Sequence, residues 1–151
     1  MVRDQGVEGL VIHLSAPQFS EIKTRGEKLV VGGGAKLGHV ISTAVREGLA
    51  GLEPLVGIPG TVGGALHGNA GTAGGDIGRR TIEAQVLTRA GEIHTRTKAD
   101  LRFAYRQSSL DELAILTATF SLEVEDPAEL TKRMQTLWIV KKANLPRGGF
   151  N

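Results

Sequence analysis

The chain has 151 residues, enough for one domain with its own hydrophobic core, and it contains no cysteine, which excludes disulfides, thiolate metal sites and a cysteine nucleophile. The net charge is only +2, and no basic run is interleaved with aromatic residues, which argues against a nucleic-acid partner. No apolar stretch approaches the roughly 18 residues of a membrane helix, so the composition indicates a soluble, cytoplasmic domain without a membrane partner.

The first third of the chain predicts three short strands and one helix. Residues 9–14 (GLVIHL) form the first strand, and residues 18–24 and 28–31 form a hairpin that turns at Arg25-Gly26-Glu27. Residues 36–47 carry apolar side chains at helical spacing, and Gly48 suits the end of that helix. A strand followed by three glycines and a helix is also the order found in dinucleotide-binding sites. Leu37 stands where the third glycine of that motif is needed, and no second βαβ unit follows, so we prefer to interpret the glycines as a tight turn.

The chain is organised around residues 51–78, which hold ten of its 21 glycines. Each ordered glycine costs roughly 0.5–1 kcal/mol of extra backbone entropy relative to alanine, so such a run is expensive to keep ordered. A flexible linker would be rich in serine and charge, whereas this run is interleaved with aliphatic residues. The pattern therefore favours a backbone shaped to lie against a ligand.

Residues 57–65 (GIPGTVGGA) carry the clearest local signals of this run. Pro59-Gly60 predicts a turn, and Thr61 suits the N-cap of a short helix that continues to about His67. Unpaired amides are then expected to converge at residues 61–64 and to favour an anion such as a phosphate or pyrophosphate. The segment is not a P-loop, because no Gly-Lys-Ser/Thr follows.

The second half of the chain predicts a hairpin, a long strand and a helix. Residues 81–88 and 92–96 pair around Ala90-Gly91, residues 98–101 form a helical turn, and residues 113–124 form the longest strand. The candidate core residues of the hairpin are Ile82, Val86 and Ile93. Short hairpins with inserted helices imply an α+β domain rather than a doubly wound parallel sheet.

The last helix is predicted to begin at Asp126-Pro127, with Glu129 in its first turn, and to end near Ala143. Its expected buried stripe is Leu130, Met134, Leu137 and Val140. Trp138 lies beside that stripe and is expected to cover an edge or to meet a partner domain. Pro146, Gly148 and Gly149 are expected to end the ordered structure.

Few residues outside the glycine-rich run suggest chemistry. The four histidines lack metal-ligand spacing, the carboxylates are not paired as in glycosidases, and no G-x-S-x-G elbow is present. The loop 103–109 (FAYRQSS) remains. From the residues alone, it reads as an amphipathic turn in which Phe103 and Tyr105 fill the core and Arg106 is solvated.

Two ordered motifs carry a family resemblance. GIPGTVGGALHGNAGTAGGDIG at residues 57–78, followed by FAYRQSSL at residues 103–110, closely resembles the UDP-N-acetylenolpyruvoylglucosamine reductase (MurB) family, whose pattern is similar to GIPGTVGGAxxMNAGAYGGEIG and then FGYRxS. The resemblance extends from VRDQGVEGLVI to KKANLP. It implies a type-2 (PCMH-like) FAD-binding subdomain with a mixed or antiparallel sheet and flanking helices. It also implies a flavoprotein oxidoreductase that uses FAD and NADPH to reduce UDP-N-acetylglucosamine enolpyruvate to UDP-N-acetylmuramate, in peptidoglycan precursor synthesis.

The resemblance also implies the site residues. Tyr105 would hydrogen-bond the nucleotide-sugar substrate, and Arg106 would contact the enolpyruvyl carboxylate as the catalytic arginine that stabilises enolate-like charge. Gly68 and Ala73 replace a methionine and an aromatic residue or histidine of the family pattern, which implies a roomier flavin wall. No metal is expected. The expected FAD-binding residues are Gly57, Ile58, Pro59, Gly60, Thr61, Val62, Gly63, Gly64, Ala65, Asn69, Ala70, Gly71 and Ile77.

The family's proton-donating serine lies in an SAG-S/C-x-F-K-N-P motif, which this sequence lacks together with the family's distant glutamate. Residues 1–151 are therefore expected to be the second subdomain of a partial FAD-binding domain, without the N-terminal subdomain and the C-terminal substrate-binding domain. Such a piece would bind FAD weakly, turn over nothing and expose a cleft wall through which it could self-associate, whereas the full-length protein would be monomeric.

Two alternatives remain open. One is a non-catalytic FAD-binding or interaction module. The other is a flavin-linked oxidase of the same fold, in which His67 is the only histidine of the glycine-rich run that could tether the cofactor.

Overall fold

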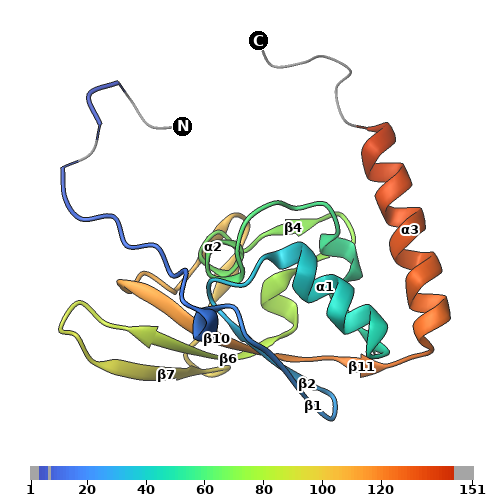
Figure 1. Ribbon diagram of the computed structural model, residues 1–151, viewed down its shortest axis with the longest axis horizontal. Helices are drawn as coiled ribbons and strands as arrows, with labels where there is room; N and C mark the ends of the chain where they lie inside the picture. The colour runs from blue at the N-terminus through green and yellow to red at the C-terminus, as the bar shows by residue number, and fades with distance from the viewer. Residues whose placement is uncertain (1–3, 7, 145–151) are drawn as a thin grey trace.

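The computed structural model describes residues 4–6 and 8–144, and its centre is a five-stranded antiparallel sheet (Figure 1). β10 lies in the middle of the sheet, with Thr119 opposite Val30 of β2 and Ala118 opposite Ala84 of β6. The last long strand thus lies between two hairpins, which confirms the expected α+β fold and makes the sheet antiparallel. In spatial order the strands are β1 (Ile22–Arg25), β2 (Lys28–Gly32), β10 (Ala114–Ser121), β6 (Thr81–Leu87) and β7 (Ile93–Thr97).

Both predicted hairpins are present, β1 with β2 and β6 with β7. The predicted core position of Ile93 is wrong, because β7 is the edge strand and leaves this side chain 65% exposed. Val86 is fully buried as expected, while Ile82 is only half-buried. The hairpin therefore contributes to the core mainly through its inner strand.

The predicted strand at residues 9–14 is wrong. This segment has no regular secondary structure, and Leu10 and Val11 are 87% and 86% exposed. A short apolar strand needs a neighbouring strand for its backbone groups, and within the described part of the chain none pairs with it.

Helices α1 (Leu37–Arg46) and α2 (Val62–His67) lie on the same side of the sheet (Figure 1). The apolar face of α1 is buried as its periodicity predicts, and Gly48 follows the helix with a φ of +70°. The core that these helices share with the sheet includes Phe120, the largest fully buried side chain. This packing holds the start of α2 against β2 and β10.

The glycine-rich run folds into a series of short ordered elements, which argues against a linker. The predicted strand at residues 113–124 is divided after Ser121, where β11 (Glu123–Val124) leaves the main sheet to pair with β3 (Leu49–Ala50). The remaining short elements are η1 (Pro17–Phe19), η2 (Glu53–Leu55), β4 (Gly71–Thr72), β5 (Gly75–Asp76), η3 (Ile77–Arg79), β8 (Phe103–Ala104) and β9 (Gln107–Ser108).

Helix α3 (Pro127–Ala143) begins as predicted, with the Asp126 carboxylate accepting a hydrogen bond from the amide of Ala128. Its predicted buried stripe is wrong in part, because only Leu130 is buried and Val140 is 54% exposed. The physical reason is that α3 stands at the side of the molecule beside α1 and η2, with its second half extending past the sheet (Figure 1). The predicted end of order at residues 146–149 lies outside the described residues.

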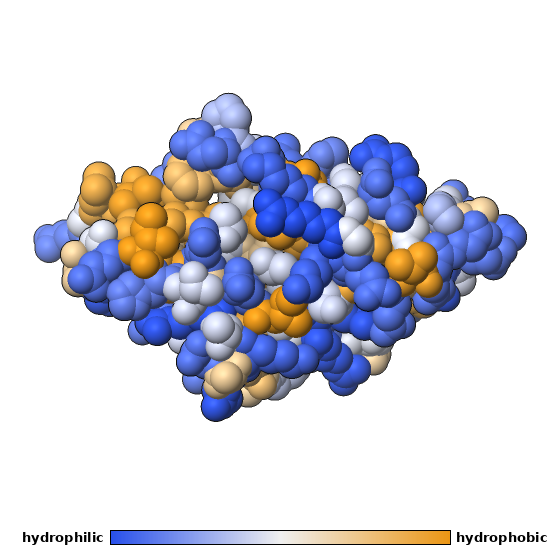
Figure 2. Space-filling view, turned by 90° about the horizontal axis from the view of Figure 1, so that it is seen from below, coloured by the Kyte–Doolittle hydropathy of each residue, from blue (hydrophilic) through white to orange (hydrophobic). Residues whose placement is uncertain are grey.

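The surface is mainly polar. Figure 2 shows a mostly hydrophilic face with its largest apolar patch at one end, on the side where Figure 1 draws the N-terminal segment. None of the helices described here is long and apolar enough to cross a membrane.

Candidate functional site

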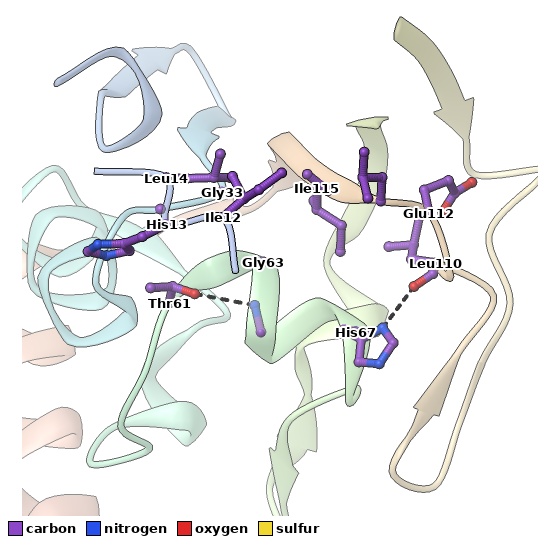
Figure 3. Close-up of a pocket in the computed structure, with 14 residues that line it drawn as sticks. Ile12, His13, Leu14, Gly33, Thr61, Gly63, His67, Leu110, Glu112 and Ile115 are labelled. Carbon is purple, nitrogen blue, oxygen red and sulfur yellow. Dashed lines mark hydrogen bonds between the residues drawn. The ribbon is translucent and has the colours of Figure 1, made fainter. Parts of the chain in front are cut away.

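Three adjoining hollows surround α2 and the β8–β9 hairpin. The sheet-side hollow, of about 430 Å³, lies between the N-terminal segment, α2 and the start of β10 (Figure 3). The loop-side hollow, of about 300 Å³, is lined by residues 58–61 and by Gly64, Ala65, Gly68, Ala70 and Arg106. The hairpin-side hollow, of about 530 Å³, is lined by residues 103–106 and by Asn69, Gly71, Thr72, Ala73 and Asp76.

The start of α2 is built as the sequence predicts. Gly60 has a φ of +109°, which completes the turn after Pro59, and the Thr61 hydroxyl accepts a hydrogen bond from the Gly64 amide at 3.3 Å. Val62 and Leu66 anchor the helix in the core with no exposed surface. Thr61 and Gly64 therefore form a ridge that borders both the sheet-side and the loop-side hollow.

The expectation that the amides of residues 61–64 converge unpaired is wrong for most of them. The Val62 amide donates to the Ala35 carbonyl at 2.9 Å, and the Gly63 amide donates to the Gly33 carbonyl at 2.8 Å. The reason is an antiparallel bridge between Lys36 and Thr61, which holds this segment against the turn that follows β2. Within the described part of the chain, the amides of Gly60 and Thr61 alone in residues 60–64 donate to no protein acceptor.

Gly64 differs from its neighbours because the fold does not require a glycine there. An added Cβ would meet only the Thr61 hydroxyl, at 3.6 Å, whereas a Cβ on Gly63 would lie 3.1 Å from the Gly33 carbonyl. Glycine inside a helix is less stable than alanine by about 1 kcal/mol. Gly64 therefore has room for a methyl group and lies on the ridge between the two hollows.

Several of the predicted cofactor-binding residues lie beneath the surface of the site and support its walls. Val62 and Ile77 are fully buried core residues, and Ala65 and Ala70 are 7% exposed. The Asn69 side chain is used within the protein: its amide nitrogen donates to the Ala104 carbonyl at 2.8 Å, and its oxygen accepts from the Gly78 amide at 3.1 Å. Asn69 therefore fastens the β8–β9 hairpin to the glycine-rich run, and it also lines the hairpin-side hollow.

The loop with Tyr105 and Arg106 is the tip of the β8–β9 hairpin. Tyr105 is 90% exposed, so the reading in which it fills the core is wrong, although Phe103 does pack against the core at Gly78. Arg106 has a φ of +57°, and its guanidinium carbon lies 5.7 Å from the centre of the Tyr105 ring. Arg106 borders both the loop-side and the hairpin-side hollow, which brings it together with Gly60 and Thr61.

Sequence reasoning missed most of the sheet-side hollow. Ile12, Leu110 and Ile115 give it apolar walls, and His67 stands on its α2 side (Figure 3). The His67 Nδ1 atom lies 2.9 Å from the Leu110 carbonyl oxygen. Because a carbonyl only accepts, Nδ1 carries a hydrogen, and Nε2 is an acceptor in the neutral form of the ring. The only sequence signal for this wall was Gly33-Gly34, which was read as a tight turn.

Charged groups with shifted pKa values lie outside these three hollows. Hydrogen bonds from the amide and hydroxyl of Thr97 lower the pKa of Asp100, and the Arg80 guanidinium lowers the pKa of Glu123. The described residues contain no group of three or more His, Cys, Asp or Glu that could hold a metal ion. The hollows offer main-chain amides and small residues, together with His13, His67 and Glu112 on the sheet side and Asp76, Tyr105 and Arg106 on the hairpin side.

Comparisons with known proteins identify the family of the chain. The model of the FAD binding domain family matches residues 1–97. UDP-N-acetylenolpyruvoylglucosamine reductase from Rhodopirellula baltica is 47% identical over 146 residues, covering 97% of this chain and 48% of the relative. The enzymes of that name from a Bradyrhizobium species and from Listeria innocua are 43% and 38% identical, covering 89% and 97% of this chain and 44% and 49% of the relatives.

The structural comparison gives the same result. The crystal structure of UDP-N-acetylenolpyruvylglucosamine reductase (MurB) from Thermus caldophilus matches with a TM-score of 0.71 and 34% identity, covering 82% of this chain and 47% of that one. The chain thus spans about half the length of the curated relatives it matches. On the sequence and the fold together, the chain belongs to the FAD binding domain family, in its UDP-N-acetylenolpyruvoylglucosamine reductase (MurB) group.

Proposed function

We propose that this chain forms part of the flavin site of an NADPH-dependent UDP-N-acetylenolpyruvoylglucosamine reductase, which reduces UDP-N-acetylglucosamine enolpyruvate to UDP-N-acetylmuramate. The observation that carries the proposal is the ridge at Thr61 and Gly64, which separates two hollows and faces Arg106 across one of them. As a step of peptidoglycan precursor synthesis, this reaction would take place in the cytoplasm.

The residues present fit FAD. A long cofactor could cross the low ridge at Gly64, since nothing but the Thr61 hydroxyl stands within 4 Å of a Cβ there. The amides of Gly60 and Thr61 are adjacent donors beside the loop-side hollow, which suits the oxygens of a phosphate or pyrophosphate. When bound, FAD would supply the hydride carrier between NADPH and the enolpyruvyl group.

Arg106 suits the substrate end of this site. Its guanidinium keeps its charge at neutral pH and offers two parallel donors to a carboxylate, and the same charge would stabilise the enolate-like substrate when hydride is added. The exposed hydroxyl-bearing ring of Tyr105 lies beside it and would hydrogen-bond the nucleotide sugar. The hairpin places both side chains at the mouth of the hollows, where a substrate can reach them.

We further propose that the chain alone binds FAD weakly and does not catalyse reduction, because it spans only about half of its relatives. The whole enzyme would act as a monomer. Titration with FAD, followed by flavin fluorescence, tests this reading, with riboflavin as a ligand that lacks the phosphates. We expect FAD to bind in the micromolar range and more tightly than riboflavin. Submicromolar FAD affinity would contradict the partial-site reading, and equal affinity for FAD and riboflavin would contradict the phosphate contact.

A second candidate is a non-catalytic flavin-binding module. It is favoured by Gly68 and Ala73, which leave space along the hollows where the family pattern has larger side chains. Under this reading, the complete protein would not reduce the substrate at all, whereas the reductase reading predicts substrate reduction that Arg106→Lys abolishes. Mass spectrometry of the protein after incubation with FAD separates both from an oxidase tethered through His67.

A further inference from the structure

Helix α3 contacts the chain just before the turn that leads into α2. The Lys141 ammonium donates to the Val56 carbonyl at 3.0 Å, across 85 positions of sequence. The Trp138 ring lies directly on Gly57, where an added Cβ would be 2.5 Å from the Cζ3 atom of the indole. Gly57 has a φ of +76°, so both its conformation and the indole require a glycine. We call Trp138 and Lys141 the α3 brace.

A third contact fixes the same segment one step earlier. Arg133 donates to a carboxylate oxygen of Glu53 at 3.0 Å and to Glu125 at 2.6 Å. Glu53 is only 2% exposed, and its other oxygen accepts from the Gly51 amide. A buried carboxylate is stable only when its oxygens are hydrogen-bonded, so this pairing anchors η2 to the first half of α3.

The second half of α3 makes few other contacts with the body of the protein. None of residues 135–143 is buried, and Ile139 and Val140 are 66% and 54% exposed. Hydrophobic burial therefore does not account for its position. The brace contacts do, and they fall on the two residues that immediately precede Ile58 and Pro59 of the loop-side hollow.

Locally, the braced segment is held by few bonds of its own. The Val56 amide donates to the Glu53 carbonyl at 3.0 Å, and the Ile58 amide donates to the Leu55 carbonyl at 3.1 Å. Gly60 and Thr61 are held separately, because the Gly60 carbonyl accepts from the Leu37 amide at 3.0 Å beside the bridge between Lys36 and Thr61. The stretch from Val56 to Pro59 is therefore the part that depends on the brace. The indole above Gly57 removes the space into which the backbone would otherwise shift.

We propose that α3 is a positioning element for the flavin site: through Trp138 and Lys141 it fixes the turn at Gly57, and so places Ile58 and Pro59 in the wall of the loop-side hollow. The part of this inference that concerns FAD rests on the proposed function. Trp138 and Lys141 touch no predicted substrate or cofactor position except Gly57, so they act through the loop and are positioning residues.

Hydrogen exchange on the 151-residue chain tests the positioning directly. In Trp138→Ala, exchange at the Val56 and Ile58 amides should accelerate about tenfold, while exchange at the amides of β10 stays as in the parent chain. Trp138→Phe, which keeps a ring over Gly57, should restore most of the protection. Ile139→Ala, an exposed position on the same helix, is the matched control. Equal acceleration in β10, or none at Val56 and Ile58, would overturn the proposal.

FAD affinity provides the second readout. Because Trp138 is the only tryptophan, its emission reports the brace contact and its quenching by bound flavin without interference. We expect Trp138→Ala and Lys141→Met each to raise the Kd for FAD about fivefold, with flavin fluorescence as the signal for the alanine variant. Unchanged FAD affinity despite faster local exchange would overturn the link to the hollow. A parent chain that binds no FAD would contradict the proposed function instead, and the exchange experiment would still decide whether the brace fixes the loop.

Discussion

Arg106 is held in a left-handed backbone conformation, with a φ of +57°, that disfavours every residue with a Cβ except in special contexts. Apart from its approach to the Tyr105 ring, the side chain has no hydrogen bond or ion pair to any described residue. The two-residue turn between β8 and β9 accounts for this conformation, but no described partner of the side chain explains why an arginine and not a glycine stands there. Comparing Arg106→Gly with Arg106→Ala isolates this strain, because both substitutions remove the guanidinium and only glycine accepts the positive φ freely.

The expected difference follows from two opposing terms. Relief of the left-handed strain is worth about 1–2 kcal/mol. The greater freedom of glycine in the unfolded chain costs about 0.5–1 kcal/mol. Arg106→Gly should therefore be more stable than Arg106→Ala by about 0.5–1 kcal/mol. Both lose the contact with the Tyr105 ring, worth about 0.5 kcal/mol at an exposed site, so the glycine variant should match the parent chain or slightly exceed it.

Urea denaturation followed by Trp138 fluorescence measures these differences, with stability taken from the linear dependence on urea. For a chain of this size, the two variants should differ in Tm by about 1–4 °C. If Arg106→Ala proved as stable as Arg106→Gly, the hairpin tip would not be strained and the reasoning from φ would fail.

Three further predictions concern the ridge, the hairpin and pH. Gly64→Leu should change the free energy of unfolding by no more than about 1 kcal/mol, because the site has room and a helix former replaces glycine. The same substitution should weaken FAD binding at least tenfold in a fluorescence titration. Unchanged affinity would show that FAD does not cross the ridge. Asn69→Ala should lower the free energy of unfolding by about 2–4 kcal/mol in urea denaturation, because the buried Gly78 amide loses its acceptor and alanine must adopt a φ of +41°. A loss below about 1 kcal/mol would show that other contacts hold the hairpin in place. The pKa of Asp100 is lowered in the folded state, so its contribution to stability is present above the usual carboxyl value of about 4 and is lost as pH falls through the lower folded value. Asp100→Asn should therefore flatten the fall in stability below about pH 4 in urea denaturation; an unchanged fall would show that Asp100 does not contribute to it.

Elements defined by neighbouring residues could be predicted from the sequence. The N-caps at Thr61 and Asp126, and the hairpin around Ala90-Gly91, each depend on a few adjacent side chains, and the structure confirms them. The predictions that failed depend on partners far along the chain. The apolar run at residues 9–14 has strand composition, but no described strand lies beside it, and Val140 has helical spacing, but its helix extends past the sheet.

The same distinction applies within the candidate site. Local reasoning placed a turn and a helix start at residues 59–61, and both are correct. It could not show that Ala35 and Gly33 would accept the amides of Val62 and Gly63, because those carbonyls come from a turn nearly 30 positions earlier. Nor could it assign Asn69 its role of fastening a hairpin 35 positions away.

The glycines of the central run show why composition alone leaves the ligand-binding positions undetermined. Gly57 is required by its positive φ and by the Trp138 ring, and Gly63 is favoured by its close approach to the Gly33 carbonyl, so the fold itself accounts for both glycines. Gly64 is open to a side chain and would be more stable as alanine, yet it borders two hollows. Only the structure separates glycines that the fold requires from a glycine that it merely permits. A glycine of the second kind points to a ligand only where it also lines a hollow, as Gly64 does and the equally open Gly38 of α1 does not.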